Sequence, residues 1–194
     1  MDFVDGETHW ERDLMIAHRI IAPILKNHDQ GIVLWRFHRR AAKDDTGHQF
    51  SFIFYSGAEQ AEAINRQVTD VPLLASMLSN QLVREVLVDR VDNNTRPNIA
   101  DTSDSQWSPV MQAAWPYYIM GVSRMWLEMI DQFSKQMGIA DPTDLGLLTA
   151  HYTAVNDEVT TIWQQESYHA LFHHLNAIYG YRPMIYWEKR LKTF

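Results

Sequence analysis

The sequence predicts an α+β fold, in which a small antiparallel sheet built on an N-terminal β-hairpin packs with long C-terminal helices. Two segments rich in aromatic and β-branched residues flank a stretch of turn-forming residues, which is typical of a hairpin. Two long stretches in the second half repeat apolar residues at helical spacing. The chain has 194 residues, 46% of them hydrophobic, so it can bury one core as a single domain over residues 1–194.

The first patterned segment covers residues 8–27 and predicts a helix. Leu14, Ile21 and Leu25 are among the apolar residues that recur there at helical spacing. Pro23 lacks the backbone N–H that a helix interior uses. We therefore expect a kink or an early stop at this proline.

The hairpin strands are expected at residues 32–38 and 49–55. The stretch between them contains Asp-Asp-Thr-Gly, which supplies turn chemistry within a long loop. Five aromatic residues alternate along the two segments, as one buried sheet face requires: Trp35, Phe37, Phe50, Phe52 and Phe54.

Two short helices and a third strand are expected after the hairpin. The helices cover residues 58–68 and 71–82, and Pro72 falls in the first turn of the second one. Residues 84–91 alternate well enough to predict a strand. Residues 92–108 are polar and form the longest expected loop.

Two long helices complete the chain. The first begins at Pro109 or Pro116 and ends near residue 137. The second covers residues 143–179, where a Thr-Asp pair caps its start and Gly180 ends it.

Composition and charge exclude several functional classes. The formal net charge of −7 argues against general binding to nucleic acid. The chain has no cysteine, so it has no disulfide framework, thiolate metal site or cysteine nucleophile. No run approaches the roughly 18 apolar residues of a membrane span, and the acidic N-terminus is not a signal peptide. We expect a soluble, cytoplasmic protein that binds neither nucleic acid nor membrane.

One local basic patch runs against this acidic balance. Its cationic or ionisable members are Arg36, His38, Arg39, Arg40 and Lys43. Two aspartates follow directly and reduce its net charge. The patch is either the solvated end of the hairpin or a site for an anion.

The last helix carries an unusual cluster of acid and imidazole. Its apolar arc, at about 100° per residue, contains Leu148, Tyr152, Val155, Val159, Ile162, Trp163 and Ala170. Glu166 lies at the centre of this arc, His173 lies within it and His169 lies on its edge. A buried carboxylate needs a partner, so we expect Glu166 to be largely buried. Its expected partners are His169, His173, His18 or Arg39.

Three interpretations of this cluster stay open. Glu166 and His169 have the Glu-x-x-His spacing of di-iron bundles, and His169 and His173 could share a metal. The second interpretation is a metal-free acid/base pair. The third is structural: the helix simply becomes polar near its end, or Glu166 caps a neighbouring element. Because only one Glu-x-x-His motif occurs, we expect neither a metal nor another cofactor.

The order of elements also resembles a known family. Phe37-His38-Arg39 ends the first aromatic strand, Gly47-His48 precedes the second, and His174-Leu175-Asn176 lies near the end of the last helix. In this order they resemble the glutamate-elimination domain of lantibiotic dehydratases, which also occurs in thiopeptide-type bacteriocin biosynthesis proteins. Phe50, Phe52 and Ala177 stand where the family has arginines. The resemblance therefore implies a changed chemistry, such as cyclisation of dehydrated peptides, or a binding accessory.

Taken with the resemblance, these residues predict an enzyme or accessory protein that matures a ribosomally synthesised peptide by dehydration or cyclisation. The expected catalytic residues are His174, Glu166, His169, His173 and His48. The expected substrate-binding residues are Arg39, Arg36 and Trp35. The expected partner is a peptide substrate or another protein, and a homo-oligomer is compatible with the sequence. The alternatives are a non-catalytic binding module whose aromatic sheet or long loop binds a partner, and a small metalloenzyme.

Overall fold

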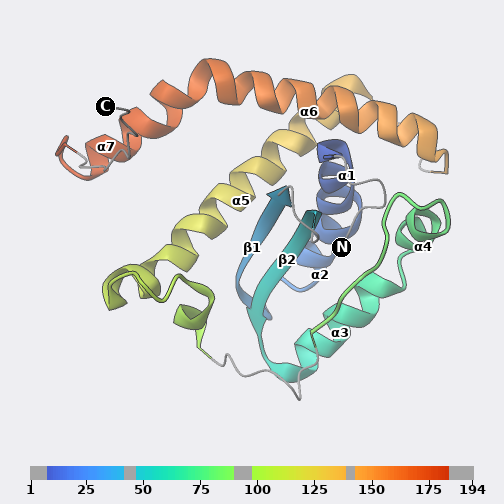
Figure 1. Ribbon diagram of the computed structural model, residues 1–194, viewed down its shortest axis with the longest axis horizontal. Coiled ribbons are helices and arrows are strands. Elements are labelled where there is room, and N and C mark those ends of the chain that lie inside the picture. The colour runs from blue at the N-terminus through green and yellow to red at the C-terminus, as the bar shows by residue number, and fades with distance from the viewer. Residues whose placement is uncertain (1–7, 42–46, 90–97, 139–142, 184–194) are drawn as a thin grey trace, which may run out of the picture. The chain divides into compact units, whose positions relative to one another are not determined.

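The computed structural model confirms the α+β class, with one two-stranded antiparallel sheet among long helices (Figure 1). It describes residues 8–41, 47–89, 98–138 and 143–183. The chain divides into two compact units, Met1–Val159 and Thr160–Phe194, and each is described by itself. The single domain over residues 1–194 stays a prediction.

The first helix is continuous from Trp10 to Asn27. It consists of α1 (Trp10–Met15), the π-helical turn η1 (Ile16–Ile21) and α2 (Ala22–Asn27). The expected early stop at Pro23 is wrong, because the helix widens just before the proline. Ala22 N–H donates to the carbonyl of Ala17, five residues back. The wider turn changes the hydrogen-bond register where a proline ring would otherwise crowd an α-helix.

The hairpin is confirmed. Strand β1 (Ile32–Ala41) pairs antiparallel with β2 (His48–Ser56), and Phe37 lies opposite Phe52. The middle of the connecting loop, residues 42–46, lies outside the described residues. Gly47, just before β2, has a φ of 66°, in the left-handed region that favours glycine.

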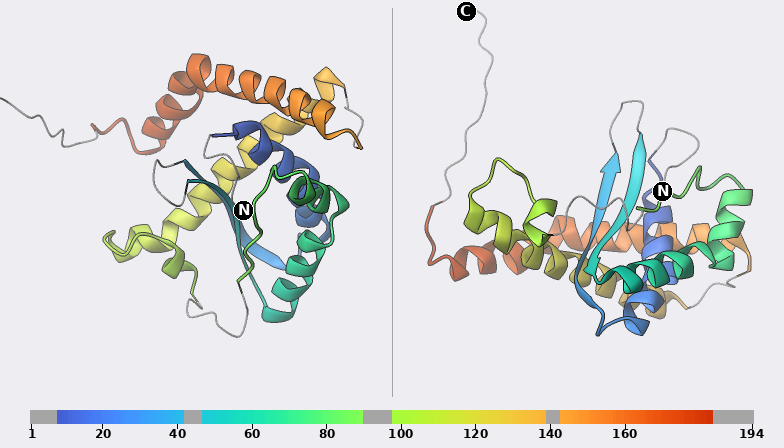
Figure 2. Two further views of the ribbon diagram at one scale, coloured as in Figure 1. Left: turned by 45° about the vertical axis from the view of Figure 1, so that its right-hand side comes forward. Right: turned by 90° about the horizontal axis from the view of Figure 1, so that it is seen from below.

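The long helix α5 (Pro109–Met137) packs beside β1, as the turned views of Figure 2 also show. Its start is capped by Ser108, whose Oγ accepts a hydrogen bond from Met111 N–H at 3.3 Å. Further along, Ser123 Oγ accepts from the backbone N–H of Phe37 at 3.1 Å. The same hydroxyl donates to the carbonyl of Ile119. The predicted helix is therefore confirmed, with Pro109 rather than Pro116 at its start.

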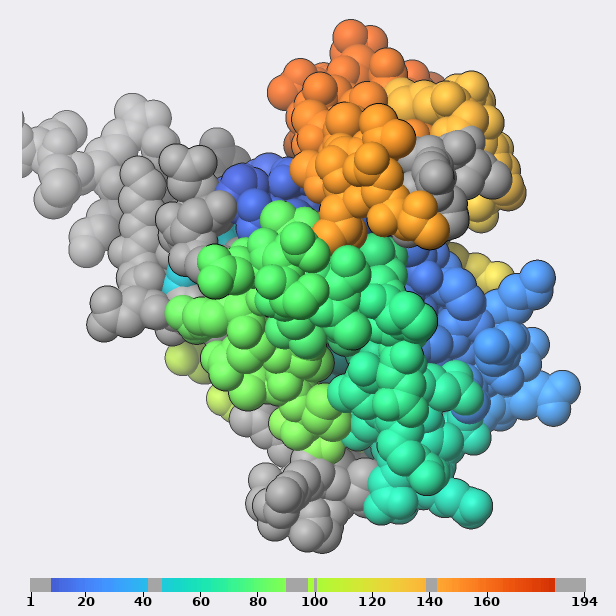
Figure 3. All heavy atoms as spheres, turned by 90° about the vertical axis from the view of Figure 1, so that its right-hand side faces the viewer, coloured from blue at the N-terminus to red at the C-terminus, as the bar shows by residue number. Residues whose placement is uncertain are grey.

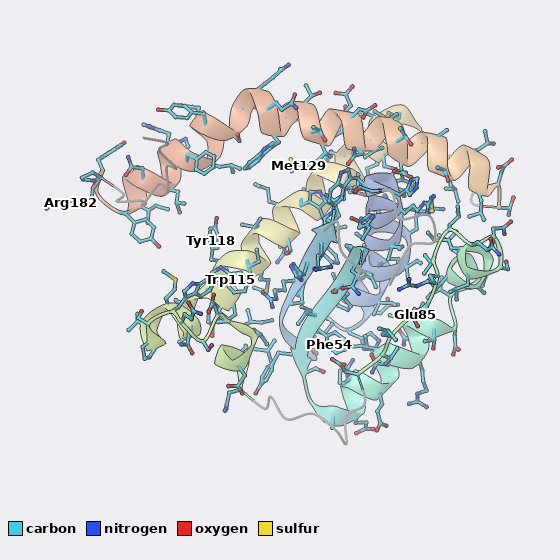
Figure 4. All side chains as sticks on the ribbon, in the orientation of Figure 1. Phe54, Glu85, Trp115, Tyr118, Met129 and Arg182 are labelled. Carbon is cyan, nitrogen blue, oxygen red and sulfur yellow. The ribbon has the colours of Figure 1, made fainter. Side chains whose placement is uncertain are left out.

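Helices α3 (Ala58–Thr69) and α4 (Pro72–Ser79) are confirmed and contribute to the face seen in Figure 3. The expected third strand is wrong, since within residues 84–89 only Glu85, labelled in Figure 4, forms an isolated β-bridge. Leu87 and Val88 are both exposed although they are neighbours. A strand that packs on a core must bury one of two successive side chains, so this segment has no buried face to hold it in the sheet.

The last helix is also continuous, as predicted. It consists of α6 (Leu145–Ser167), a second π-helical turn η4 (Tyr168–His173) and α7 (His174–Ile178). Asp144 Oδ1 caps its start by accepting hydrogen bonds from Gly146 N–H at 2.8 Å and Leu147 N–H at 3.0 Å. Gly180, with a φ of 70°, follows its end.

The core of the first unit lies between the first helix, the hairpin, α3, α4, α5 and the start of α6. Its largest fully buried side chains include Tyr152, Phe50, Leu14, Ile20, Ile64 and Met77. Fully burying one such side chain typically contributes about 1.5–3 kcal/mol. None of the described helices is both long enough and apolar enough to cross a bilayer.

Candidate functional site

The residues expected to carry function fall into two separate groups. Arg36, Arg39 and His48, with Trp35, belong to the hairpin of the first unit. Glu166 and the three clustered histidines belong to the second unit. Each group is considered in turn.

A fully buried carboxylate organises the hairpin group. Asp13, on α1, uses a single oxygen for two partners: Oδ2 accepts from Arg39 Nε at 2.7 Å and from His48 Nε2 at 3.1 Å. The backbone N–H of His9 donates to His48 Nδ1 at 3.2 Å. Because Nδ1 accepts a hydrogen bond and Nε2 faces a carboxylate, this network fits a neutral imidazole that carries its hydrogen on Nε2.

Strand geometry explains why these polar residues turn inward. Side chains two residues apart share a face of a strand, so Arg39 shares a face with Phe37. Across the sheet, Arg39 lies opposite Phe50, and His48 lies two residues before Phe50 on the same face. The aromatic row that fills the core therefore ends in Arg39 and His48. Asp13, on α1, supplies the carboxylate oxygen that accepts a hydrogen bond from each of them.

Two indoles enclose the Arg39 guanidinium. Its Cζ lies 4.4 Å from the ring centroid of Trp10 and 4.9 Å from that of Trp126, on α5. Each such contact typically contributes about 0.5–2 kcal/mol. Nη2 donates to the carbonyl of Trp10 at 3.3 Å. The Arg39 side chain is still 26% exposed, whereas the His48 side chain is 2% exposed.

We call this group the Arg39 site: Trp10, Asp13, Arg39, His48 and Trp126. The charge of Arg39 is already matched by Asp13, and the geometry fits a neutral His48. Arg39, the accessible member, thus offers guanidinium N–H donors beside the rings of Trp10 and Trp126. Its positive charge is balanced by Asp13. Such a site suits a neutral acceptor, such as a peptide carbonyl, beside an apolar group.

Arg36 and Trp35 lie elsewhere on the hairpin. Arg36 Nη2 donates to the carbonyl of Thr102 at 3.0 Å, and its Cζ lies 4.6 Å from the ring centroid of Trp115, labelled in Figure 4. Burial lowers the pKa of Arg36. Trp35 packs edge-on against Phe37 at 5.2 Å between ring centroids. Arg36 therefore holds η3 (Ile99–Thr102), a 3₁₀ helix within the expected loop before α5, against β1, and Trp35 belongs to the aromatic packing.

His18, named above as one expected partner of Glu166, is instead the centre of a second polar group. Its Nδ1 lies 2.8 Å from the hydroxyl of Tyr152, and its Nε2 lies 3.3 Å from Asp131 Oδ1. Burial lowers the pKa of His18, although Asp131 opposes the shift. Burial also raises the pKa of Tyr152. In α5 and α6, Ser134 Oγ and His151 Nε2 are 2.9 Å apart.

The expected burial of Glu166 is wrong. Glu166 is exposed, and none of the described residues forms a hydrogen bond or ion pair with its carboxylate. The apolar arc of α6 is buried from Leu148 to Val159, but Trp163 beyond it is 54% exposed. Periodicity therefore identified the face correctly, but the buried length of that face ends before Glu166.

The three histidines of the second unit do lie together. His169 and His173 stack with ring centroids 5.2 Å apart and planes 12° apart, and His174 lies 5.4 Å from each. All three are exposed. Parallel stacked rings do not direct their nitrogens at one point. In the described part of the chain, no group of three or more His, Cys, Asp or Glu residues is arranged to hold a metal ion.

The sequence interpretation missed Asp13, Trp10 and Trp126. Asp13 is followed by buried apolar residues of the same helix, and a carboxylate in such a place signals a buried partner. In the hairpin, Arg39 and His48 occupy strand positions on the same face as the buried Phe37 and Phe50. Polar residues at such positions also signal a buried partner. Nothing in the spacing of Trp126, on a distant helix, indicates that it meets Arg39.

Comparisons with models of protein families, with curated proteins and with solved structures found no match to this chain. The family resemblance therefore rests on the residues given above, and the geometry of the site carries the functional argument.

Proposed function

We propose that this chain is an enzyme or accessory protein in the maturation of a ribosomally synthesised peptide, by dehydration or cyclisation, and that the Arg39 site binds that peptide. The observation that carries the proposal is the partly exposed Arg39 guanidinium, held between Trp10 and Trp126 and neutralised by Asp13. The resemblance contributes the class of substrate. Because such peptides are modified where they are made, the proposed location is cytoplasmic.

The geometry suits a peptide backbone for two reasons. Nε of Arg39 is committed to Asp13 and Nη2 also serves the carbonyl of Trp10, so the guanidinium is fixed before any ligand arrives. Pre-organised donors lose little entropy on binding. The flanking indoles offer apolar surface to aromatic, proline or methyl-bearing side chains beside the bound carbonyl.

A non-catalytic peptide-binding module is the second candidate. It is favoured by the burial of His48, whose side chain is 2% exposed and whose two ring nitrogens both have partners. In that arrangement His48 is a positioning residue that orients Asp13. A general acid or base must instead reach the proton that it transfers.

The test uses the peptide encoded by a short Ser-, Thr- and Cys-rich reading frame beside the gene. We expect the purified full-length chain to bind this synthetic peptide in calorimetry. The variant Arg39→Lys keeps a cation beside Asp13 but loses the planar fork, so we expect binding to weaken at least about tenfold. Mass spectrometry of the incubated peptide separates the two candidates, since only an enzyme changes its mass.

The matched control is Arg66→Lys, at an exposed position of α3, which should bind as the unmodified chain does. Equal binding by the Arg39→Lys and Arg66→Lys variants would show that the Arg39 site is not the peptide site. The absence of any such reading frame, or of any binding to its peptide, would remove the proposed substrate class.

A further inference from the structure

The second polar group of the first unit joins three helices, and the Arg39 site does not use it. His18 comes from the π-helical turn η1, Asp131 and Ser134 come from α5, and His151 and Tyr152 come from α6. We call these five residues the junction network. Tyr152 and Ser134 are buried, and the other three are partly buried. Polar networks with little access to water must satisfy their hydrogen bonds internally.

The hydrogen positions at His18 follow from its partners. A hydrogen bond from Lys135 lowers the pKa of Asp131, so this carboxylate is ionised at neutral pH and can only accept. Nε2 of His18, which faces Asp131, therefore carries a proton. When His18 is neutral, Nδ1 accepts a hydrogen bond from the Tyr152 hydroxyl. The phenol keeps its proton, because burial raises its pKa.

His151 adds a second imidazole to the network. Its Nε2 is paired with the buried hydroxyl of Ser134, and Tyr152 also interacts with Ser134. Arg19 lies close enough to disfavour a positive charge on both His18 and His151. Two imidazoles and one arginine therefore meet where α5 and α6 pack against the first helix.

The other charges around the network come from α5. Asp131 favours a proton on His18, while Lys135 already pairs with Asp131 and is itself influenced by Glu128. Among the described residues, the one carboxylate that pairs with His18 is thus shared with a lysine. Burial is the largest influence on His18 and on His151, and it disfavours their charged forms.

We propose that the junction network is a pH-responsive latch, which holds η1, α5 and α6 together while His18 and His151 are neutral and loosens when they gain protons. A second proton on His18 occupies Nδ1, so the Tyr152 hydroxyl can only accept there and its own proton must find another acceptor in this buried network. A proton on His151 adds positive charge beside Arg19. Both events disfavour the packed arrangement of the three helices.

The latch is connected to the Arg39 site through the same helices. The first helix carries Trp10 and Asp13 as well as His18, and α5 carries Trp126 as well as Asp131. Loosening these helices changes the separation of the two indoles that enclose Arg39. This inference does not depend on which ligand the Arg39 site binds.

The direction of the pH effect follows from linkage. Both histidines have a folded-state pKa below the ordinary value of 6.5. The folded protein then binds fewer protons than the unfolded chain in the interval below 6.5. Their contribution to stability is fully present above about pH 6.5 and is lost as the pH falls toward the folded-state values.

The test is urea unfolding of the full chain at several pH values between 8 and 5. We expect the midpoint to fall with pH, and we expect His18→Gln to make that fall smaller. Glutamine can still accept from Tyr152 and donate to Asp131, but it cannot titrate. The double variant with His151→Gln should remove more. His38→Gln, at an exposed position, should retain the whole fall.

A second measurement covers the case in which the His18 variant does not fold. Imidazole proton resonances of the unmodified chain should show His18 and His151 titrating below 6.5. Fluorine resonances of 5-fluorotryptophan at Trp10 and Trp126 should move over the same pH interval. Titration of His18 at or above 6.5, or equal pH dependence in the His18→Gln and His38→Gln variants, would overturn the latch.

Discussion

The two groups of polar residues differ in what surrounds them. In the Arg39 site, a fully buried aspartate serves an arginine and a histidine within 3.1 Å. In the second unit, Glu166 and three histidines are exposed, and ring stacking is the main contact of the histidines. Both groups combine a carboxylate with imidazole. Only the first is desolvated, and desolvation is what makes a polar contact strong and its loss costly.

The largest expected effect tests the buried side of this comparison. Asp13→Asn removes the fully buried carboxylate that Arg39 and His48 share and leaves the partly buried Arg39 guanidinium without its counter-charge. We expect the free energy of unfolding, measured in urea, to fall by about 3–5 kcal/mol. A loss below about 1 kcal/mol would mean that water reaches Arg39 freely and that the two groups are alike.

Two matched tyrosines sharpen the comparison. Tyr152→Phe removes a buried hydroxyl that serves His18, and we expect it to reduce the free energy of unfolding by about 1–3 kcal/mol. Tyr168 is 82% exposed, so Tyr168→Phe should stay within about 0.5 kcal/mol of the unmodified chain. Chemical denaturation at pH 8 measures both, and equal losses would contradict the contrast in burial.

Alkaline pH tests Tyr152 in a different way. Burial raises its folded-state pKa above the ordinary value of 10.0. The folded chain then keeps a proton that the unfolded chain loses, so this contribution to stability is present below about pH 10 and is lost as the pH rises further. Over one pH unit above 10 we expect a loss of up to about 1.4 kcal/mol. Tyr152→Phe should show a smaller slope than Tyr168→Phe in unfolding curves between pH 9 and 11.

The smallest effect is expected in the second unit. Glu166→Gln should change the free energy of unfolding by no more than about 0.5 kcal/mol, because the carboxylate is exposed and has no partner among the described residues. Thermal unfolding of the variant and the unmodified chain would measure this effect. Repeating both measurements with a chelator would detect a bound metal as a loss of stability. A clear loss of stability in the variant would show that Glu166 has a partner after all.

The sequence was sufficient for elements whose pattern is local. The hairpin and the two long helices follow from alternation, helical spacing and capping residues, and the structure confirms them. The strand expected at residues 84–91 is wrong because a regular alternation of residue types does not ensure that one face is covered. The π-helical turns depend on small changes in hydrogen-bond register, which single-residue propensities do not encode.

The candidate site was only partly predictable. Arg39 and His48 could be selected from the hairpin, but their shared partner Asp13 is 26 and 35 residues away in the chain. Such pairings depend on how the first helix crosses the sheet, and spacing along one element does not report that. The predicted burial of Glu166 was wrong for the converse reason. Helical periodicity shows which face of a helix is apolar, but it does not show how much of that face another element covers.

The hydroxyl of Ser123 has a consequence for association between molecules. A two-stranded sheet has two edges, and an open edge is a template on which another chain can add a strand. By accepting the Phe37 N–H, Ser123 occupies a donor on the outer edge of β1, and α5 covers that edge. In a Ser123→Val chain, α5 would still lie over this edge, but the buried N–H of Phe37 would lose its acceptor. One hydroxyl on a neighbouring helix thus lets that helix close an open sheet edge without leaving a backbone donor unsatisfied.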